Sequence, residues 1–194
     1  MPKTNQKTVI GICGLGGAGK DTAIKEISKI RKISEIQLRT IVEDQLKLEG
    51  KEINNENLRL CATKLREKYG QDVIAKRAAK KVKKMLLDTD FVIINSIKSL
   101  EEADTFRKGL KSKFILLSVY ASPKTRFGRL SKRGLAWDMT DYKSFEWRDR
   151  VELSWGLGGA IAMADFIILN EGTIAELNRD VISLIKRMEK QKRR

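Results

Sequence analysis

Histidine is absent from this sequence of 194 residues. No histidine acid–base pair, histidine-based triad or histidine-ligated zinc site can therefore exist in the chain. The two cysteines, Cys13 and Cys61, fall in apolar stretches, so we expect reduced core thiols and not a disulfide. No apolar run approaches the roughly 20 residues that span a membrane. The polar residues 1–7 run straight into a predicted strand, so the sequence predicts no membrane partner and a cytoplasmic location.

Negative charge is scarce relative to positive charge. The chain has 40 Lys and Arg against 25 Asp and Glu, a formal net charge of +15. This excess favours anionic partners, which include nucleotides, nucleic acid and acidic membranes. Much of it lies in residues 76–84 and 186–194, where solvated helix faces are the simpler interpretation. Since no Pro/Gly/Ser-rich linker divides the chain, we expect one domain, residues 1–194.

The spacing G-x-x-x-x-G-K occurs at residues 14–20, between the apolar run 8–13 and a helical pattern that begins near Asp21. In that context backbone N–H groups surround an anion, a helix N-terminus adds its dipole, and the lysine reaches the terminal phosphates. The sequence therefore predicts a phosphate-binding loop for ATP, formed by Gly14, Leu15, Gly16, Gly17, Ala18, Gly19, Lys20, Asp21 and Thr22.

The same glycines also satisfy a second pattern, because Gly14, Gly16 and Gly19 match the dinucleotide-binding fingerprint G-x-G-x-x-G. That fingerprint needs an acidic residue at the end of the second strand, where this chain has Leu38-Arg39-Thr40, although Arg39 suits a 2′-phosphate. Lys20 directly follows the last glycine and favours the phosphate loop.

Five apolar runs are predicted strands, at residues 8–13, 33–38, 91–95, 114–120 and 165–170, and helical periodicity separates them. Continuous apolar strands that alternate with helices predict an α/β fold, a parallel sheet covered on both faces. Ligands bind at the carboxyl ends of such strands. After the third strand, Ser99 and Glu102 form a predicted capping box, whereas Lys98 either faces the phosphate site or lies on the surface.

Basic and aromatic residues interleave from Arg126 to Arg150, and Trp137, Trp147 and the nearby Trp155 are the three tryptophans. Such a segment can close over a nucleotide as a lid, with Arg126, Arg148 and Arg150 neutralising the transferred phosphoryl group. The alternative is a helix pair whose arginines face water and whose tryptophans pack on the sheet, the interpretation that we favour for Trp155. The run GLGG at residues 156–159 predicts a tight helix junction.

Three blocks resemble the archaeal adenylate-kinase-related P-loop proteins, which are similar in turn to nucleoside monophosphate kinases and dephospho-coenzyme A kinases. They are residues 72–76, ASPKTR at 121–126, and RDRVELSWGLG at 148–158 with AMAD at 162–165. The resemblance covers nearly the whole chain. It implies a three-layer P-loop NTPase fold of the nucleoside monophosphate kinase type with a five-stranded parallel sheet, an acceptor arm at about residues 39–88 and a lid at about residues 126–155.

The chain departs from that family where the chemistry should be. Asp21 stands where phosphate loops place Ser or Thr on Mg²⁺. In the arm, Thr40 and Glu43 align with an aspartate and an arginine of the relatives, and Gly159 aligns with a glutamate. The relatives tend to have Asp-Gly-x-Arg where this chain has residues 95–98, NSIK.

Two roles for Asp21 stay open. With Thr22 it is a ligand of Mg²⁺, or it turns away and caps its own helix, where the dipole favours a carboxylate. A carboxylate about 5 Å from a phosphate repels it by roughly 3 kcal/mol in a medium of dielectric constant near 20, and an intervening metal ion reverses the sign.

The leading functional hypothesis is an ATP- and Mg²⁺-dependent phosphotransferase. It moves the γ-phosphate to AMP, another nucleoside monophosphate or a similar small acceptor, with Lys20, Arg126, Arg148 and Arg150 as catalytic residues and with Thr40 and Lys98 on the acceptor side. Glu43 and Asn95 motivate an alternative, a degenerate nucleotide-binding sensor or partner-binding module without turnover. Nucleic-acid binding through the positive charge is a third hypothesis, but no nucleic-acid module is recognisable.

Overall fold

The computed structural model describes residues 7–133 and 141–191, with side chains as far as residue 188. Its strands form one parallel sheet in the order β2-β3-β1-β4-β5. They are β1 (Thr8–Cys13), β2 (Ser34–Gln37), β3 (Phe91–Ile97), β4 (Lys113–Tyr120) and β5 (Phe166–Leu169). The α/β fold with a five-stranded parallel sheet is therefore confirmed. β3 runs two residues beyond its predicted end, because the chain bulges at Ser96 and then pairs again with β1.

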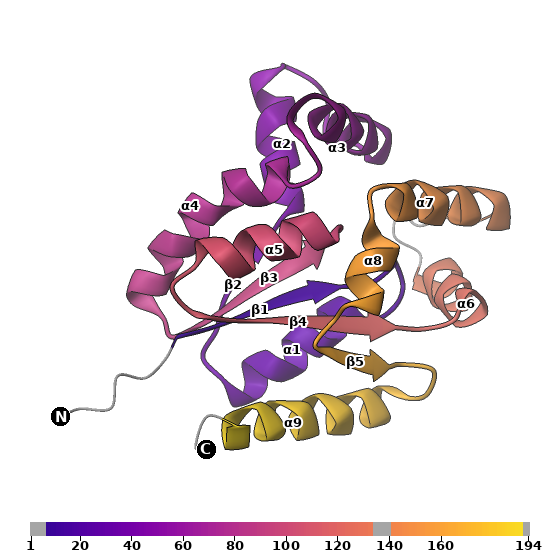
Figure 1. Ribbon diagram of the computed structural model, residues 1–194. Coiled ribbons are helices and arrows are strands. Elements are labelled where there is room, and N and C mark those ends of the chain that lie inside the picture. Colours follow the sequence, from indigo (N-terminus) through magenta and orange to yellow (C-terminus); the bar gives the residue numbers. More distant parts are fainter. Residues whose placement is uncertain (1–6, 134–140, 192–194) are drawn as a thin grey trace.

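Helices cover both faces of the sheet (Figure 1). On one face lie α1 (Lys20–Ile30) and α9 (Ile174–Gln191), and on the other lie α4 (Val73–Asp88), α5 (Leu100–Gly109) and α8 (Leu157–Ala162). The remaining helices of the described residues are α2 (Arg39–Leu48), α3 (Asn55–Tyr69), α6 (Pro123–Arg133) and α7 (Tyr142–Ser154). Within the described ranges, no helix combines the length and the apolar character that a membrane crossing requires.

The central strand β1 explains why the sequence shows a continuous apolar run there. All six of its residues are buried, because helices cover the sheet on both sides. Ile10 and Ile12 face the core beneath α1 and α9, whereas Val9 and Cys13 face the core beneath α4 and α5. Cys13 and Cys61 are free and buried, as predicted. The chain leaves β1 in the middle of the carboxyl edge, where the phosphate loop begins.

Two helical insertions stand at this carboxyl edge (Figure 1). Helices α2 to α4 join β2 to β3, and helices α6 and α7 lie between β4 and β5. We call them the arm, residues 39–88, and the lid segment, residues 123–154. Within the arm, α4 packs against the sheet through fully buried residues such as Ala75, Ala78 and Val82, so α2 and α3 are the part that projects.

Side-chain caps fix where several of these helices begin. Asn54 accepts a hydrogen bond from the Asn57 N–H at the start of α3, and Asp141 accepts one from the Ser144 N–H at the start of α7. Ser99 accepts from the Glu102 N–H and caps α5, as predicted, but the Glu102 carboxylate accepts from the Lys98 N–H. Gly156, in the left-handed region with φ 100°, forms the predicted junction before α8.

Candidate functional site

The phosphate loop, residues 14–20, requires glycine for two different reasons. Gly14 has φ 140°, and a Cβ there would lie 2.3 Å from the Val119 carbonyl oxygen, so the loop passes too close to β4 for a side chain. Gly19 has φ 101° and precedes the first residue of α1, a backbone conformation that strains other residues. The Asn170 side-chain amide, which follows β5, donates to the Ala18 carbonyl at 2.8 Å and so ties the loop to the end of that strand.

Lys20 lies over this loop in the structure. Its Nζ donates to the Gly14 carbonyl at 2.7 Å and to the Leu15 carbonyl at 3.1 Å. Burial, and next the charge of Lys98, lower the pKa of Lys20 to about 8. The ammonium group is thus a half-buried cation whose only hydrogen-bond partners among the described residues are neutral carbonyls, and an anion on the loop would compensate its charge.

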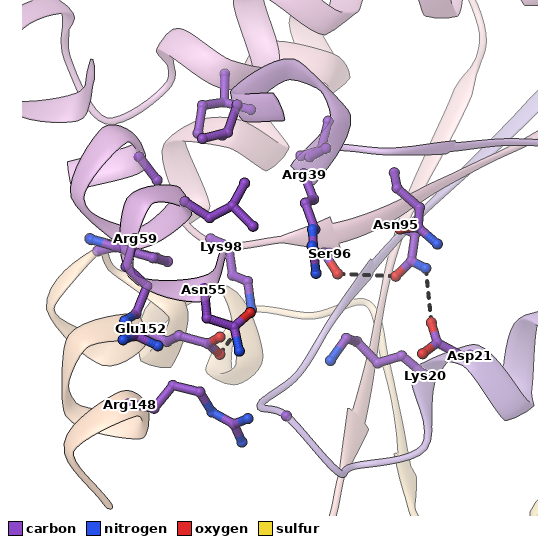
Figure 2. A pocket seen from close by; sticks show the side chains of 18 of the residues that line it. Lys20, Asp21, Arg39, Asn55, Arg59, Asn95, Ser96, Lys98, Arg148 and Glu152 are labelled. Atoms are coloured by element: carbon purple, nitrogen blue, oxygen red, sulfur yellow. Dashed lines mark hydrogen bonds and ion pairs between the residues drawn. The ribbon is translucent and has the colours of Figure 1, made fainter. Parts of the chain in front are cut away.

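A cavity of about 310 Å³ opens between the loop, the arm and the lid segment. Its lining is strongly basic, with Lys20, Arg39, Arg59, Arg66, Lys98, Arg133 and Arg148 against Asp21 and Glu152 as the charged residues. Figure 2 shows Lys20 and Asp21 on one side of this space and Arg59, Arg148 and Glu152 on the other. The volume is at the lower end of the range of small-molecule sites.

Helix α7 supplies two charged side chains to the cavity, one turn apart. Arg148 lies so close to the loop that a Cβ on Gly16 would be 2.3 Å from its Nη2. Glu152 forms an ion pair with Lys98, with 2.8 Å between Oε2 and Nζ. Burial raises the pKa of Glu152, but Lys98, Lys20 and Arg148 together outweigh burial and hold it below its usual value. Of the two positions considered for Lys98, the structure shows the one beside the phosphate loop.

Asp21, the second residue of α1, meets the end of β3. The Asn95 amide is 2 % exposed and donates from Nδ2 both to Asp21 Oδ1 at 3.1 Å and to Glu35 Oε1 at 2.9 Å. The Ser96 hydroxyl donates to Asn95 Oδ1 at 3.2 Å (Figure 2). Ser96 has φ 69°, in the left-handed region that favours glycine. Asp21 therefore faces the cavity, and its Oδ1 is held by Asn95.

Four other predicted site residues do not line the cavity. The Arg126 guanidinium is buried in a bidentate ion pair with Asp149, and its Nη1 donates to the Gly16 carbonyl at 3.2 Å. It therefore ties α7 to the phosphate loop and does not line the cavity. Arg150 is 74 % exposed and pairs with Glu146 on its own helix. The Thr40 hydroxyl donates to the Gln37 carbonyl at 2.8 Å, outside the cavity. Thr22 is half-buried on α1 and is not a lining residue.

Sequence patterns did not identify the arginines that the arm contributes to the cavity. Arg59 of α3 lines the cavity and lies over the Trp147 ring, 4.7 Å from its centroid. Arg66, on the same helix, forms a buried ion pair with Glu102, 2.6 Å between Nη2 and Oε1. A spacing of seven residues places both on one face of α3, the only signal that could have pointed to them.

The tryptophans in and directly after the lid segment differ from one another. Trp155 is buried, as the packing interpretation predicted, and its Nε1 donates to the Thr63 hydroxyl at 3.1 Å. Its ring also lies under the Arg66 guanidinium, 4.7 Å from the centroid, and lines the cavity. Trp147 is half exposed, and Trp137 lies outside the described residues.

A parallel sheet in this strand order, with a glycine-rich loop leading into α1 and a basic cavity above it, defines a protein with a P-loop kinase fold. Solved structures agree: the shikimate kinase of Bacteroides thetaiotaomicron aligns with a TM-score of 0.58 at 13% identity over 92% of this chain and 98% of its own. The dephospho-CoA kinase of Campylobacter jejuni aligns with a TM-score of 0.56 at 15% identity over 95% and 98%.

Sequence comparison identifies the family. The UPF0200 protein TK1334 of Thermococcus kodakarensis is 35% identical over 178 residues, which cover 91% of this chain and 96% of the relative. The chain therefore belongs to the UPF0200 family, whose name carries no activity. No family model matches the sequence. The function has to be argued from the site.

Proposed function

We propose that the protein is an ATP- and Mg²⁺-dependent phosphotransferase that moves the γ-phosphate to a small acceptor, a nucleoside monophosphate or a similar molecule. One observation carries this proposal: the phosphate loop with Lys20 forms one wall of a cavity whose opposite wall is a set of cations from the arm and the lid segment. Phosphoryl transfer needs mainly positioning and charge stabilisation, and these residues supply both.

The loop fits the phosphates of a nucleotide. A Cβ at Gly16 would meet the Arg148 guanidinium, and one at Gly17 would lie 2.9 Å from the Arg126 carbonyl oxygen, so only glycine lets the loop pass this close to α6 and α7. The N-terminus of α1 adds its dipole at the same point. In the proposal, residues 14–22 hold the phosphates, and Lys20 leaves its two carbonyl partners for them.

Asp21 fits a magnesium ion. Mg²⁺ in kinase sites is bound by one or two carboxylates together with substrate phosphates, and Asp21 offers a carboxylate beside the loop with Oδ2 free of the Asn95 contact. In the proposal, Asp21, with Thr22 beside it, holds the ion. When bound, Mg²⁺ neutralises the charge that develops on the phosphate oxygens.

Arg148 is the cation that the proposal assigns to the transferred phosphoryl group, because its guanidinium lies against Gly16. A preorganised donor of this kind contributes about 10²- to 10³-fold to the rate. Lys98, paired with Glu152, marks the acceptor side of the cavity. Arg126 supports this arrangement by fixing α7 on the loop. Arg150 and Thr40 would join the site only if the lid segment and arm rearrange.

The test is phosphoryl transfer from γ-labelled ATP with Mg²⁺ to AMP, other nucleoside monophosphates and dephospho-coenzyme A. We expect transfer to at least one acceptor, and a loss of about 10²- to 10³-fold in kcat for Arg148→Gln with ATP affinity nearly unchanged. Arg107→Gln is the matched control, since Arg107 pairs with Asp104 on α5 away from the cavity. No transfer to any of these acceptors would remove the kinase claim.

A non-catalytic nucleotide-binding module is the second candidate, and Asn95 is the observation that favours it. Phosphate-loop enzymes use an aspartate for Mg²⁺ in this region, whereas this chain presents an amide. Calorimetry separates the two candidates. Tight binding of ATP together with no binding of AMP and no turnover would identify the module.

A further inference from the structure

Two guanidinium groups in the cavity form no ion pair or hydrogen bond within the described part of the chain, although the charge of Glu152, which is paired with Lys98, acts on both. Arg39 pairs with Glu43, Arg66 with Glu102 and Lys98 with Glu152, and Lys20 donates to carbonyls. Among the described residues, no hydrogen bond or ion pair holds Arg59 or Arg148. Each lies instead beside an aromatic ring, Arg59 over Trp147 and Arg148 at 5.8 Å from the centroid of Phe145.

Some of the donor nitrogens of these two half-buried side chains are shielded from water as well as unpaired within the described residues. Nε of Arg59, and Nε and Nη2 of Arg148, are buried atoms without a hydrogen-bond partner. Leaving a buried donor unsatisfied costs about 1–3 kcal/mol, and more when the group is charged. Burial, followed by the charge of Arg148, lowers the pKa of Arg59. The two cations therefore repel each other, and a bound anion that contacts them would relieve both penalties.

The two arginines come from different helices, α3 and α7, of the wall that faces the loop, and they contact different parts of the cavity. Arg148 lies against Gly16 of the phosphate loop, so it belongs to the donor phosphates. Arg59 lies on α3 of the arm, one turn after Asn55, which also lines the cavity (Figure 2). The acceptor must approach from the arm side, because the loop occupies the other side.

We propose that Arg59 binds an anionic oxygen group of the acceptor, so that the acceptor is a small molecule with a phosphate or a carboxylate and not a neutral polyol or nucleoside. This proposal rests on the proposed phosphotransferase function. A guanidinium presents two parallel N–H donors that match both groups. Trp147 fixes the plane of Arg59 by stacking and so orients these donors before the acceptor arrives.

The experiment compares matched anionic and neutral acceptors on the full chain: AMP against adenosine, and shikimate against its methyl ester. Binding is measured by calorimetry with the nucleotide site saturated by a non-hydrolysable ATP analogue, and transfer is measured with ATP. Arg59→Gln removes the cation. Arg77→Gln is the control, because Arg77 is an exposed arm residue that donates to Gln45 outside the cavity.

For the wild type we expect binding of AMP or of shikimate and none of the neutral partner. Arg59→Gln should weaken that binding about 10- to 100-fold, the range of one charge-assisted contact of 1.5–3 kcal/mol. ATP affinity should stay within about twofold, which also shows that the variant is folded. Equal affinity of Arg59→Gln and wild type for the anionic acceptors, or use of a neutral acceptor, would overturn the proposal.

Failure of this proposal and failure of the phosphotransferase function give different results. Transfer that is independent of Arg59 leaves the kinase function standing and removes the anion subsite. Arg59-dependent binding of AMP without any transfer supports the anion subsite and removes the kinase function. If none of the four molecules binds, the subsite is refuted, and the transfer assay decides the activity by itself.

Discussion

The phosphate loop and the wall that faces it are built in opposite ways. The loop, residues 14–20, consists of backbone held in shape by glycines and by neighbouring carbonyls and amides. The facing wall consists of long charged side chains from α3 and α7, fixed by ion pairs and aromatic contacts. A backbone site is specified by local spacing and tolerates little change. A side-chain site can be retuned one residue at a time.

The buried pair of Arg66 and Glu102 is the part of the facing wall whose loss should have the largest effect. Their side chains are 3% and 0% exposed, and removing one partner of such a pair costs about 3–5 kcal/mol. Arg66→Met should lower the free energy of unfolding by about this amount in urea titrations, because Glu102 keeps a buried charge. Combined with Glu102→Gln, the same change should cost clearly less. An equal loss of unfolding free energy in both variants would show that lost packing, and not an unpaired buried charge, causes the destabilisation.

The pH dependence of the Arg66→Met variant sharpens this test. Burial raises the pKa of Glu102 even with Arg66 present, and loss of Arg66 raises that pKa further. The folded state then binds the proton more tightly than the unfolded state, so stability falls as the pH rises above the ordinary glutamate pKa. The stability lost in Arg66→Met should become smaller as the pH falls towards 4. A loss of stability that does not change with pH would contradict this account of Glu102. ATP affinity should survive in the folded variant, since the loop does not depend on this pair.

The proposed magnesium site beside the loop gives the next largest effect, because a carboxylate lies on the helix and an amide lies on the strand. Asp21→Ser should reduce the Mg²⁺ dependence of ATP binding about 10- to 100-fold, measured by calorimetry with and without the ion. Asn95→Asp alone would gather three carboxylates, with Asp21 and Glu35 both hydrogen-bonded to this position. We therefore expect the combined Asp21→Ser/Asn95→Asp variant to regain most of the lost dependence. A loss that is simply additive would rule out an exchange of roles between the two positions.

The contrast between the two walls also explains what the sequence could predict. Strands such as β1, the loop and the junction at Gly156 are encoded by neighbouring residues, so they follow from apolar runs and glycine spacing. Arg59 and Arg126 are not of this kind. Arg126 resembles a lid arginine in sequence but is buried against Asp149, and Arg59 resembles a solvated helix position but faces the cavity. Their different positions, Arg126 buried and Arg59 in the cavity, follow from how α3, α6 and α7 pack at one edge of the sheet. This packing cannot be predicted from the local sequence.

The charge of Lys20, on the loop, is coupled to the charge of Lys98, on the facing wall of the cavity. The titration of Lys20 should have the smallest effect of those considered, an effect on ATP affinity. Burial, and then Lys98 of the facing wall, lower the pKa of Lys20 to about 8, so about three quarters of it is neutral at pH 8.5. Bound phosphates favour the charged form, and binding must then take up a proton. We expect ATP without Mg²⁺ to bind about fourfold more weakly at pH 8.5 than at pH 7, a difference of about 0.8 kcal/mol.

Calorimetry at pH 8.5 in buffers of different ionisation enthalpy measures this proton directly, with an expected uptake approaching about 0.8 proton per ATP. Lys20→Arg is the control, because a guanidinium does not titrate in this range, and its binding should show neither the uptake nor the added pH dependence. Lys98→Gln should reduce the uptake, since one of the two cations that face each other is removed. Unchanged uptake in that variant would mean that burial alone tunes Lys20, and that the two walls act independently before the nucleotide binds.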